Sequence, residues 1–176
     1  LAQQGDASSQ NNLGLMYENG LGVAQNDKQA VAWYQKAAQQ GHILAQFNLG
    51  NMYYNGTGVA QNYQQAFAWF QKAANQGNAD AQYNLGLMYV HGRGVAKNDK
   101  QAVVWYQKAA QQGDVRAQNN LGMMYAEGRG VAQDDKQAAA WWQKAAQQGD
   151  TGAQHNLAMM YAEGIGVAKN PQQAKA

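Results

Sequence analysis

The residues with which this chain could do chemistry are few, and histidine is the first to consider. The three histidines are His42, His91 and His155. The ligands of a metal ion must converge on one point, and nothing in the spacing of these three brings them together. The sequence therefore predicts no metal site. The histidines are assigned to surface or helix-capping positions instead.

The carboxylates form no catalytic constellation either. Asp27, Asp99 and Asp135 fall in the first turn of a predicted helix, where the helix dipole favours a negative charge. Glu127 and Glu163 lie near the ends of two different predicted helices. Neither a Ser–His–Asp grouping nor a pair of acids stands out. We predict no catalytic residue and no enzyme activity.

Cysteine and glycine exclude further kinds of site. The chain has no cysteine, which excludes a disulfide framework, a thiolate zinc site and a cysteine nucleophile. Gly20-Leu21-Gly22 and its copies resemble fragments of a nucleotide-binding motif, but no predicted strand precedes them. They join two predicted helices. The sequence therefore predicts no cofactor.

Composition narrows the class of partner. Of 176 residues, 45% are hydrophobic and 10% aromatic, enough for a buried core. The net charge is +2 and the basic residues are spread evenly, whereas nucleic-acid binding requires a concentrated basic surface. No apolar run approaches the ~20 residues that span a bilayer. We expect no nucleic-acid partner and no membrane insertion.

The elements that carry these residues follow a repeat of 36 residues. This spacing separates Gly14, Gly50, Gly86 and Gly122, and likewise Trp33, Trp69, Trp105 and Trp141. Self-similarity at a fixed period is the signature of a repeat array. We predict a single array over residues 1–176, cut within a repeat at both ends. Its units are approximately 6–41, 42–77, 78–113, 114–149 and 150–176.

Each unit is predicted to form two helices, and residues 42–77 serve as the sample. The first helix has apolar residues at helical spacing, which mark one buried face: Ala45, Leu49, Met52 and Tyr53. The second has the same kind of stripe: Ala66, Trp69, Phe70, Ala73 and Ala74. The tryptophan and tyrosine columns are assigned to the core. Mid-helix glycines such as Gly50 are assigned to close approach between helices.

Residues typical of helix ends fix the register. Asn78 is a good N-cap for a first helix, and Gly56 fits a left-handed C-cap. Asn62 and Gln65 resemble a capping box, in which each side chain satisfies a backbone N–H of the other residue. Pro171, the only proline, falls at the first helical position of a last second helix beginning at residue 170.

The recurring residues resemble a known family. They read Ala-x-Ala-Gln-x-Asn-Leu-Gly-x-Met-Tyr-x-x-Gly-x-Gly-Val, then Ala-x-x-Trp-x-x-Lys-Ala-Ala-x-x-Gly, over essentially the whole chain. This pattern resembles the Sel1-like repeat, a relative of the tetratricopeptide repeat. The resemblance implies an all-α fold, a right-handed α/α superhelical solenoid with a concave inner surface. It also implies an adaptor in multiprotein complexes, with a periplasmic or secreted location favoured and a cytoplasmic one left open.

Positions that differ from repeat to repeat are predicted to bind a partner. On each first helix they are spaced by 3, 4 and 3 residues, so at about 100° per residue they share one arc, opposite the apolar one. In a tetratricopeptide-like stack that arc lines the concave groove. The predicted partner-binding residues are Leu44, Phe47, Tyr54, Tyr83, Leu87, Val90, Arg116, Asn119, Met123, His155 and Met159. Exposed apolar surface of this kind typically marks a partner site. The alternative is that some of these side chains pack between neighbouring first helices.

Three functions follow from these patterns. The leading hypothesis is a non-catalytic scaffold that binds a peptide or protein partner on the concave face. One alternative is a hydrolase acting on a small amide such as a β-lactam or a cell-wall fragment, although neither a nucleophile nor a base can be named. A β-lactam-binding branch of the family staples each repeat with a disulfide, and this chain has no cysteine. The other alternative is a structural array that associates end to end with further copies of itself.

Overall fold

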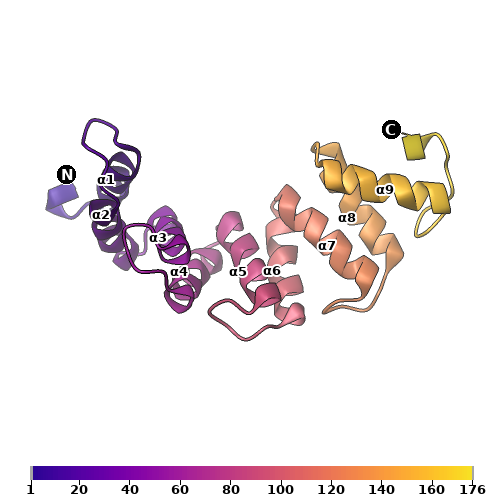
Figure 1. Cartoon of the computed structure of the whole chain (residues 1–176), viewed down its shortest axis with the longest axis horizontal. Helices are drawn as coiled ribbons and strands as arrows, with labels where there is room; N and C mark the ends of the chain where they lie inside the picture. Colours follow the sequence, from indigo (N-terminus) through magenta and orange to yellow (C-terminus); the bar gives the residue numbers. More distant parts are fainter. Residues whose placement is uncertain (1, 176) are drawn as a thin grey trace. The chain divides into compact units, whose positions relative to one another are not determined.

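The computed structural model describes the backbone of residues 2–175 and the side chains of residues 2–174. Every regular element in that part of the chain is a helix (Figure 1). The predicted all-α fold, a solenoid of helix-turn-helix repeats, is confirmed. With η for a 3-10 helix, the elements are η1 (Ala2–Gln4), α1 (Ala7–Asn19), α2 (Asp27–Gln39), α3 (Ile43–Asn55), α4 (Tyr63–Asn75), α5 (Ala79–His91), α6 (Asp99–Gln111), α7 (Val115–Glu127), α8 (Asp135–Gln147), α9 (Thr151–Glu163) and η2 (Gln173–Lys175).

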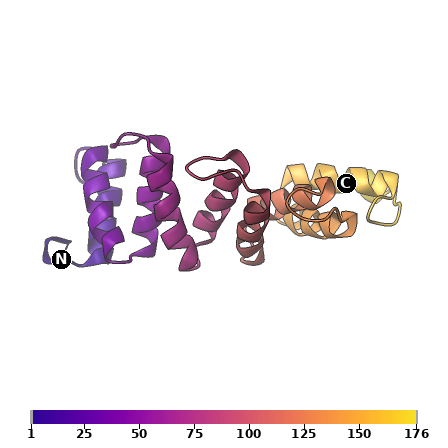
Figure 2. The same ribbon diagram turned by 90° about the horizontal axis from the view of Figure 1, so that it is seen from below.

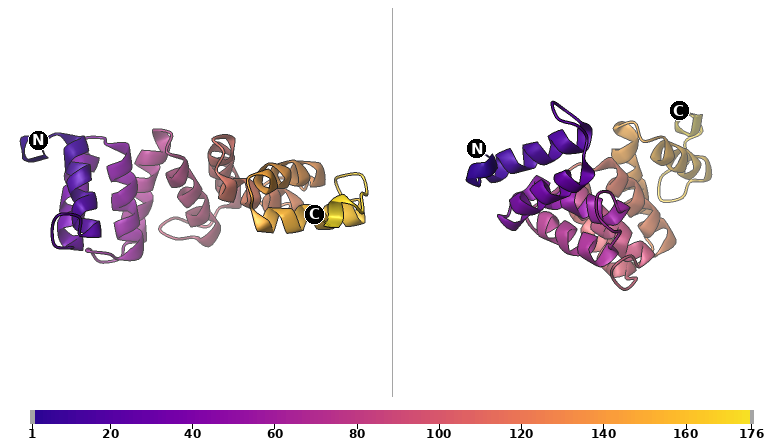
Figure 3. Two further views of the ribbon diagram at one scale, coloured as in Figure 1. Left: turned by 90° about the horizontal axis from the view of Figure 1, so that it is seen from above. Right: turned by 60° about the vertical axis from the view of Figure 1, so that its left-hand side comes forward.

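These helices belong to two compact units, unit 1 (Leu1–Ala96) and unit 2 (Lys97–Ala176). In unit 1, α1 pairs with α2 and α3 with α4, while α2 also contacts α3 and α4 contacts α5. Figure 2 and Figure 3 show the helices of unit 1 standing side by side. In unit 2, α7 contacts both α6 and α8, and α9 packs on α8. The first helices of the repeats are α1, α3, α5, α7 and α9, and the second helices are α2, α4, α6 and α8.

Local hydrogen bonds set the ends of the first helices as predicted. The Asn78 side chain accepts a hydrogen bond of 2.8 Å from the amide of Ala81, which caps α5. His42 does the same for α3, because its Nδ1 accepts from the amide of Ala45 at 3.2 Å. At the other end of α3, Gly56 has a φ of 72° and donates its N–H to a carbonyl of the last turn. Glycine reaches this left-handed conformation without the steric cost that a Cβ imposes.

The capping box predicted at the start of the second helix forms only one of its two hydrogen bonds, so this prediction is half wrong. The Asn62 side chain accepts from the amide of Gln65 at 3.0 Å, as expected. The amide of Asn62, however, donates to the carbonyl of Tyr53 at 2.9 Å and is not left for the Gln65 side chain. The cap residue therefore ties the second helix back to the first helix of its own hairpin.

The mid-helix glycines make room for an aromatic ring. A Cβ at Gly50 in α3 would lie 2.7 Å from ring carbons of Phe70 in α4, a distance that packed atoms do not tolerate. Gly14 stands in the same way against Tyr34, with the nearest ring carbons at 2.6 Å. Phe70 is 1% exposed and Tyr34 is fully buried. The prediction that these glycines allow helices to approach closely is confirmed in both hairpins.

The assignment of whole tryptophan and tyrosine columns to the core is wrong in part. Trp105 and Trp141 are buried, but Trp33 and Trp69 are half-buried, as are the tyrosines of the Tyr53 column. A lysine one turn later lies over each tryptophan ring, and the Lys36 ammonium is 4.1 Å from the centroid of the Trp33 ring. One ring face thus contacts a cation at the surface. The aromatic residue that follows each tryptophan, such as Tyr34 or Phe70, packs inside the hairpin instead.

Buried glutamines of the first helices link successive second helices. Gln46 in α3 is 4% exposed. Its Nε2 donates to the carbonyl of Ala38 at the end of α2, at 3.2 Å. Its Oε1 accepts from Nε2 of Gln76, the C-cap of α4, at 2.8 Å. One buried side chain is therefore hydrogen-bonded to the C-terminal ends of both α2 and α4.

The predicted last second helix does not form as an α-helix. Asn170 still acts as a cap, because its side chain accepts from the amides of Gln172 and Gln173. The chain then forms a turn and the 3-10 helix η2, which packs on α9. The final position of that predicted helix, Ala176, lies outside the described residues.

Candidate partner-binding surface

The predicted partner-binding residues divide by exposure. The exposed ones are Leu44, Arg116, Met123, His155 and Met159. The half-buried ones are Phe47, Tyr54, Tyr83, Leu87, Val90 and Asn119. They lie on α3 and α5 of unit 1 and on α7 and α9 of unit 2. The exposed group is open to a partner, whereas the neighbours of the half-buried group must be identified first.

Phe47 and Tyr54 pack on the second helix of their own hairpin. The ring centroid of Phe70 in α4 lies 5.9 Å from that of Phe47 and 6.4 Å from that of Tyr54. Tilted ring pairs at this separation are favourable beyond the area they bury. Each of these two side chains is therefore partly packed inside the hairpin and partly exposed at the surface.

In other hairpins, too, the residues at the positions of Phe47 and Tyr54 contact the aromatic residue of the second helix. In the first hairpin the hydroxyl of Tyr34 donates to the carboxylate of Glu18 in α1. Burial and this hydrogen bond raise the pKa of Tyr34 above its usual range. In unit 2 the indole Nε1 of Trp142 donates to the backbone carbonyl of Asn119 at 3.2 Å. In the first hairpin a variable side chain therefore matches the ring of the second helix, whereas in unit 2 the backbone makes the contact.

The first-helix surface of unit 2 is polar at one end of α7 and apolar beyond it. Arg116 forms an ion pair with Asp114, the N-cap of α7, at 2.5 Å. The Oδ1 of Asn119 is buried and accepts no hydrogen bond within the part of the chain that the structure describes. Met123 and Met159 are 38% and 49% exposed. Flexible, polarisable methionines of this kind are common on surfaces that bind protein partners.

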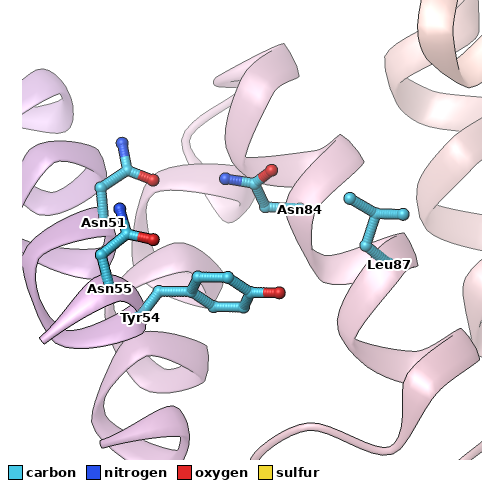
Figure 4. A pocket seen from close by; sticks show the side chains of 5 residues that line it. All are labelled: Asn51, Tyr54, Asn55, Asn84 and Leu87. Atoms are coloured by element: carbon cyan, nitrogen blue, oxygen red, sulfur yellow. The ribbon is translucent and has the colours of Figure 1, made fainter. Parts of the chain in front are cut away.

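Unit 1 brings Tyr54 and Leu87 together around a pocket of about 190 Å³ between α3 and α5. Asn51, Asn55 and Asn84 complete its lining. Figure 4 shows the amides of Asn51 and Asn84 pointing toward one another across the pocket, while the Tyr54 ring reaches from α3 toward α5. The pocket therefore combines three amides, one aromatic ring and one aliphatic side chain.

The asparagines of this pocket were not among the predicted residues. Asn84 belongs to a column that recurs in every first helix: Asn12, Asn48, Asn84, Asn120 and Asn156. The signal was present in the sequence, because a polar residue recurs in each unit at a place where it caps no helix. All but the first of the column are half-buried. The Nδ2 of Asn48 donates to the side chain of Asn11 at 3.3 Å, which shows that amides on neighbouring first helices of unit 1 come within bonding distance.

Arg93, in the loop after α5, places a cation beside the same pocket. Its Nη1 donates to the hydroxyl of Tyr54. This bond raises the pKa of Arg93 further above its ordinary value, so the guanidinium stays charged. The guanidinium carbon lies 5.7 Å from the Tyr54 ring centroid and 5.8 Å from that of Tyr63. No carboxylate of the described residues forms an ion pair with it.

The described residues contain neither a metal-binding cluster nor a membrane-spanning helix. No group of three histidine, cysteine, aspartate or glutamate side chains is placed to hold a metal ion among residues 2–174. None of the helices that the structure describes is both long and apolar enough to cross a bilayer.

Comparison with known proteins gives a consistent family. The Sel1 repeat family model matches five times, at residues 7–42, 43–78, 79–114, 115–150 and 151–176. The c5321 protein, a protective antigen of uropathogenic Escherichia coli strains with an SLR fold, shares 44% identity at a TM-score of 0.97. The match covers 99% of this chain and 37% of the antigen, so this chain spans well under half of that protein.

Two further solved structures extend the likeness. A Sel1 repeat protein of Oxalobacter formigenes shares 41% identity over 98% of this chain and 68% of its own, at a TM-score of 0.90. Cysteine rich protein B of Helicobacter pylori shares 28% identity over 72% of this chain and 90% of its own, at a TM-score of 0.57. No similar sequence was found among curated proteins. Because the family model covers nearly every residue and two solved relatives exceed 40% identity, the chain belongs to the Sel1 repeat family.

Proposed function

We propose that this chain is a non-catalytic scaffold whose first helices bind an extended segment of a partner protein. Sel1 repeat proteins are typically protein-interaction scaffolds. The observation that carries the proposal for this chain is the pocket between α3 and α5, lined by Tyr54, Leu87 and three asparagines. Its volume is about 190 Å³.

The chemistry of the pocket suits a peptide backbone. An asparagine amide offers both an acceptor oxygen and two N–H donors, which match the C=O and N–H of an extended chain. Asn51 and Asn84 present such amides from two neighbouring helices, so one peptide unit between them could bond to both (Figure 4). Tyr54 and Leu87 supply the apolar contact area that interface cores favour.

The remaining predicted residues extend this surface within each unit. In unit 1, Leu44 is 53% exposed on the same helix as Tyr54, and Tyr83 and Val90 lie on α5 with Leu87. In unit 2, Met123 and Met159 form a second, more apolar stretch. We assign partner contacts to both stretches, with the pocket of unit 1 as the anchor.

Peptide selection tests the proposal without knowledge of the natural partner. A random dodecapeptide library, displayed on phage, is selected against the chain, and enriched peptides are synthesised for fluorescence anisotropy. We expect the double variant Asn84→Ala, Leu87→Glu to lose at least tenfold in affinity, because it removes an amide and charges the apolar wall. The matched comparison in unit 2 is Asn156→Ala, Met159→Glu, whose loss of affinity should be much smaller because the anchor of the peptide is the pocket of unit 1.

Circular dichroism checks that both double variants remain helical. If no peptide is enriched, or if both double variants bind every enriched peptide like the wild type, the pocket of unit 1 is not a peptide site.

Self-association is a second candidate, supported by a hollow of about 330 Å³ between α8, α9 and η2. Leu157 and Tyr161 line it together with several glutamines. Leu157 is half-buried here, whereas Leu121, its counterpart one repeat earlier, is completely buried. A helix of a second copy could cover this surface. Light scattering over a concentration series would show a rising apparent mass, which Leu157→Gln should abolish.

A further inference from the structure

Arg93, beside the unit 1 pocket, carries a charge with which no carboxylate of the described residues forms an ion pair. Arginine carries five N–H donors on a planar fork, and within the described part of the chain the Arg93 side chain forms one hydrogen bond, to the Tyr54 hydroxyl. The side chain lies at the surface, against the rings of Tyr54 and Tyr63. Those rings are themselves in edge contact, with centroids 5.1 Å apart. The guanidinium is therefore held in place while most of its donors stay open to a ligand.

At Arg129, the equivalent position one repeat later, neighbouring carboxylates compensate the charge. It lies 36 residues after Arg93, in the loop that follows α7. Its Nη2 is 3.4 Å from a carboxylate oxygen of Asp99, the first residue of α6, and its Nη1 is 3.4 Å from Glu127. These two acids neutralise Arg129 within unit 2. At the place of Asp99, unit 1 has Tyr63, which stacks on the cation but carries no charge to compensate it.

We propose that the α3–α5 pocket recognises an internal aspartate or glutamate side chain of an extended peptide, which pairs with Arg93 while Asn51 and Asn84 hold the adjoining backbone. This proposal rests on the function proposed above. A carboxylate matches a guanidinium fork, because the two groups can form two parallel N–H···O bonds. The pocket itself is lined by amides, a ring and a leucine, none of which repels a carboxylate.

The predicted surface continues beyond the pocket along both helices. Leu44 on α3 and Tyr83 on α5 lie on the same arc as Tyr54 and Leu87, nearer the other end of their helices. A segment anchored at Arg93 can therefore extend along both helices beyond the pocket. An apolar residue next to the acid would then contact Leu87.

The test uses the peptides selected on phage, in which a linker to the coat protein blocks the C-terminus. We expect aspartate or glutamate to be enriched at one position, next to an aliphatic residue. Replacing that acid by its amide should weaken binding about tenfold to the wild type, the size of one charge-assisted pair. Against Arg93→Gln the same replacement should change affinity less than about twofold, because the cationic partner is gone.

Two further variants separate charge from structure. Arg129→Gln is the matched control, and it should bind acidic peptides like the wild type because Arg129 is already paired. Arg93→Lys keeps the charge but loses the fork, so it should bind with an affinity between those of the wild type and Arg93→Gln. Both variants are checked for helicity by circular dichroism.

Other outcomes would overturn the inference. Enriched peptides without an acid that are still lost on Asn84→Ala, Leu87→Glu would leave the proposed function standing and remove the acidic specificity. A peptide whose affinity falls on C-terminal amidation, and not on replacement of the internal acid, would point to a terminal carboxylate instead. Failure to select any peptide would remove the proposed function as well.

Discussion

The α3–α5 surface of unit 1 and the α7–α9 surface of unit 2 correspond residue for residue, two repeats apart, yet they differ in chemistry. The unit 1 residues are Asn51, Tyr54, Asn55, Leu87 and Arg93; their unit 2 counterparts are Met123, Ala126, Glu127, Met159 and Ile165. One surface has a pocket with a cation beside it, and the other has exposed methionines, an exposed isoleucine and a carboxylate. The helices that carry both sets have the same length and each ends at a left-handed glycine, although the N-caps are His42 and Asn78 in unit 1 and Asp114 and Asp150 in unit 2.

The difference is possible because the contacts that recur in both units are made mostly by other residues. The scaffold depends on the apolar arc, on the buried glutamines and on loop glycines that pack against the preceding hairpin. Substitutions of the loop glycines and of the buried glutamines should therefore lower the free energy of unfolding equally in both units. Substitutions elsewhere should have different effects in the two units.

The largest effect is expected at the loop glycines Gly94 in unit 1 and Gly130 in unit 2. Each has a φ of 68°, and a Cβ there would overlap the backbone carbonyl of Tyr63 or Asp99 respectively. Left-handed strain of ~1–2 kcal/mol and steric overlap of ~1–3 kcal/mol should add. We predict that Gly94→Ala and Gly130→Ala each lower the free energy of unfolding by about 3 kcal/mol, measured by urea denaturation.

Gly77→Ala separates the two causes. Gly77 also has a positive φ, 94°, but nothing lies within 4 Å of its missing Cβ. Only the conformational strain, ~1–2 kcal/mol, should remain. Equal losses at Gly77 and Gly94 would show that the loop does not press on the preceding second helix.

The buried glutamines should come next, again with equal effects in the two units. Gln46→Leu and Gln118→Leu each remove two side-chain hydrogen bonds, one to a helix-end carbonyl and one from another glutamine. We expect a loss of ~2 kcal/mol in unfolding free energy for each, about 1 kcal/mol for each hydrogen bond. Gln154→Leu is the control, since Gln154 is exposed and should change stability by less than ~0.5 kcal/mol.

The first difference between the units is expected at the mid-helix glycines. A Cβ at Gly122 would lie 2.6 Å from Nε1 of Trp142, an indole fixed by its hydrogen bond to Asn119. At Gly50 the neighbour is Phe70, whose ring has no polar anchor and can tilt. Overlap of ~1–3 kcal/mol is offset by the ~1 kcal/mol by which alanine favours a helix.

We therefore predict a net loss of about 2 kcal/mol for Gly122→Ala and under about 1 kcal/mol for Gly50→Ala. Thermal and urea denaturation of the two variants measure this. The reverse order would show that ring anchoring does not decide how each hairpin tolerates a methyl group.

These contacts also mark where sequence reasoning succeeded. The cap at Asn62 and the turn at Gly56 were predictable because they depend on residues three or four positions away. The fit of Gly50 to a ring was predictable from the repeat, since both columns recur in register. Gln46 was missed because its partners, Ala38 and Gln76, lie in two other helices.

The candidate site was predicted less completely than the fold. Tyr54 and Leu87 were named from their variability alone. Asn84 was overlooked because it recurs, and recurrence was taken as a sign of the core. Arg93 was overlooked because it lies in a loop, and because its importance depends on Tyr63, a tyrosine where other second helices begin with aspartate. A relation of that kind appears only when residues distant in sequence are placed together.

The smallest effect on stability, and the most direct test of the comparison, is expected from rebuilding the unit 1 pocket in unit 2. The graft consists of Met123→Asn, Ala126→Tyr, Glu127→Asn, Met159→Leu and Ile165→Arg. Most of these side chains are exposed, so we predict a change in unfolding free energy of ~0.5 kcal/mol or less. Isothermal titration with an acidic peptide selected on the wild type then measures whether a second equivalent binds.

Asp135 decides the outcome of that titration. It begins α8 as Asp99 begins α6, and Gly166 brings the loop that carries residue 165 against its backbone. In the graft alone, Asp135 should neutralise the new cation as Asp99 neutralises Arg129, and the second equivalent should be weak or missing. Adding Asp135→Tyr should release the charge and increase affinity at the new site about tenfold. If the graft binds equally with and without Asp135→Tyr, the uncompensated charge that distinguishes Arg93 from Arg129 is not what recognises the peptide.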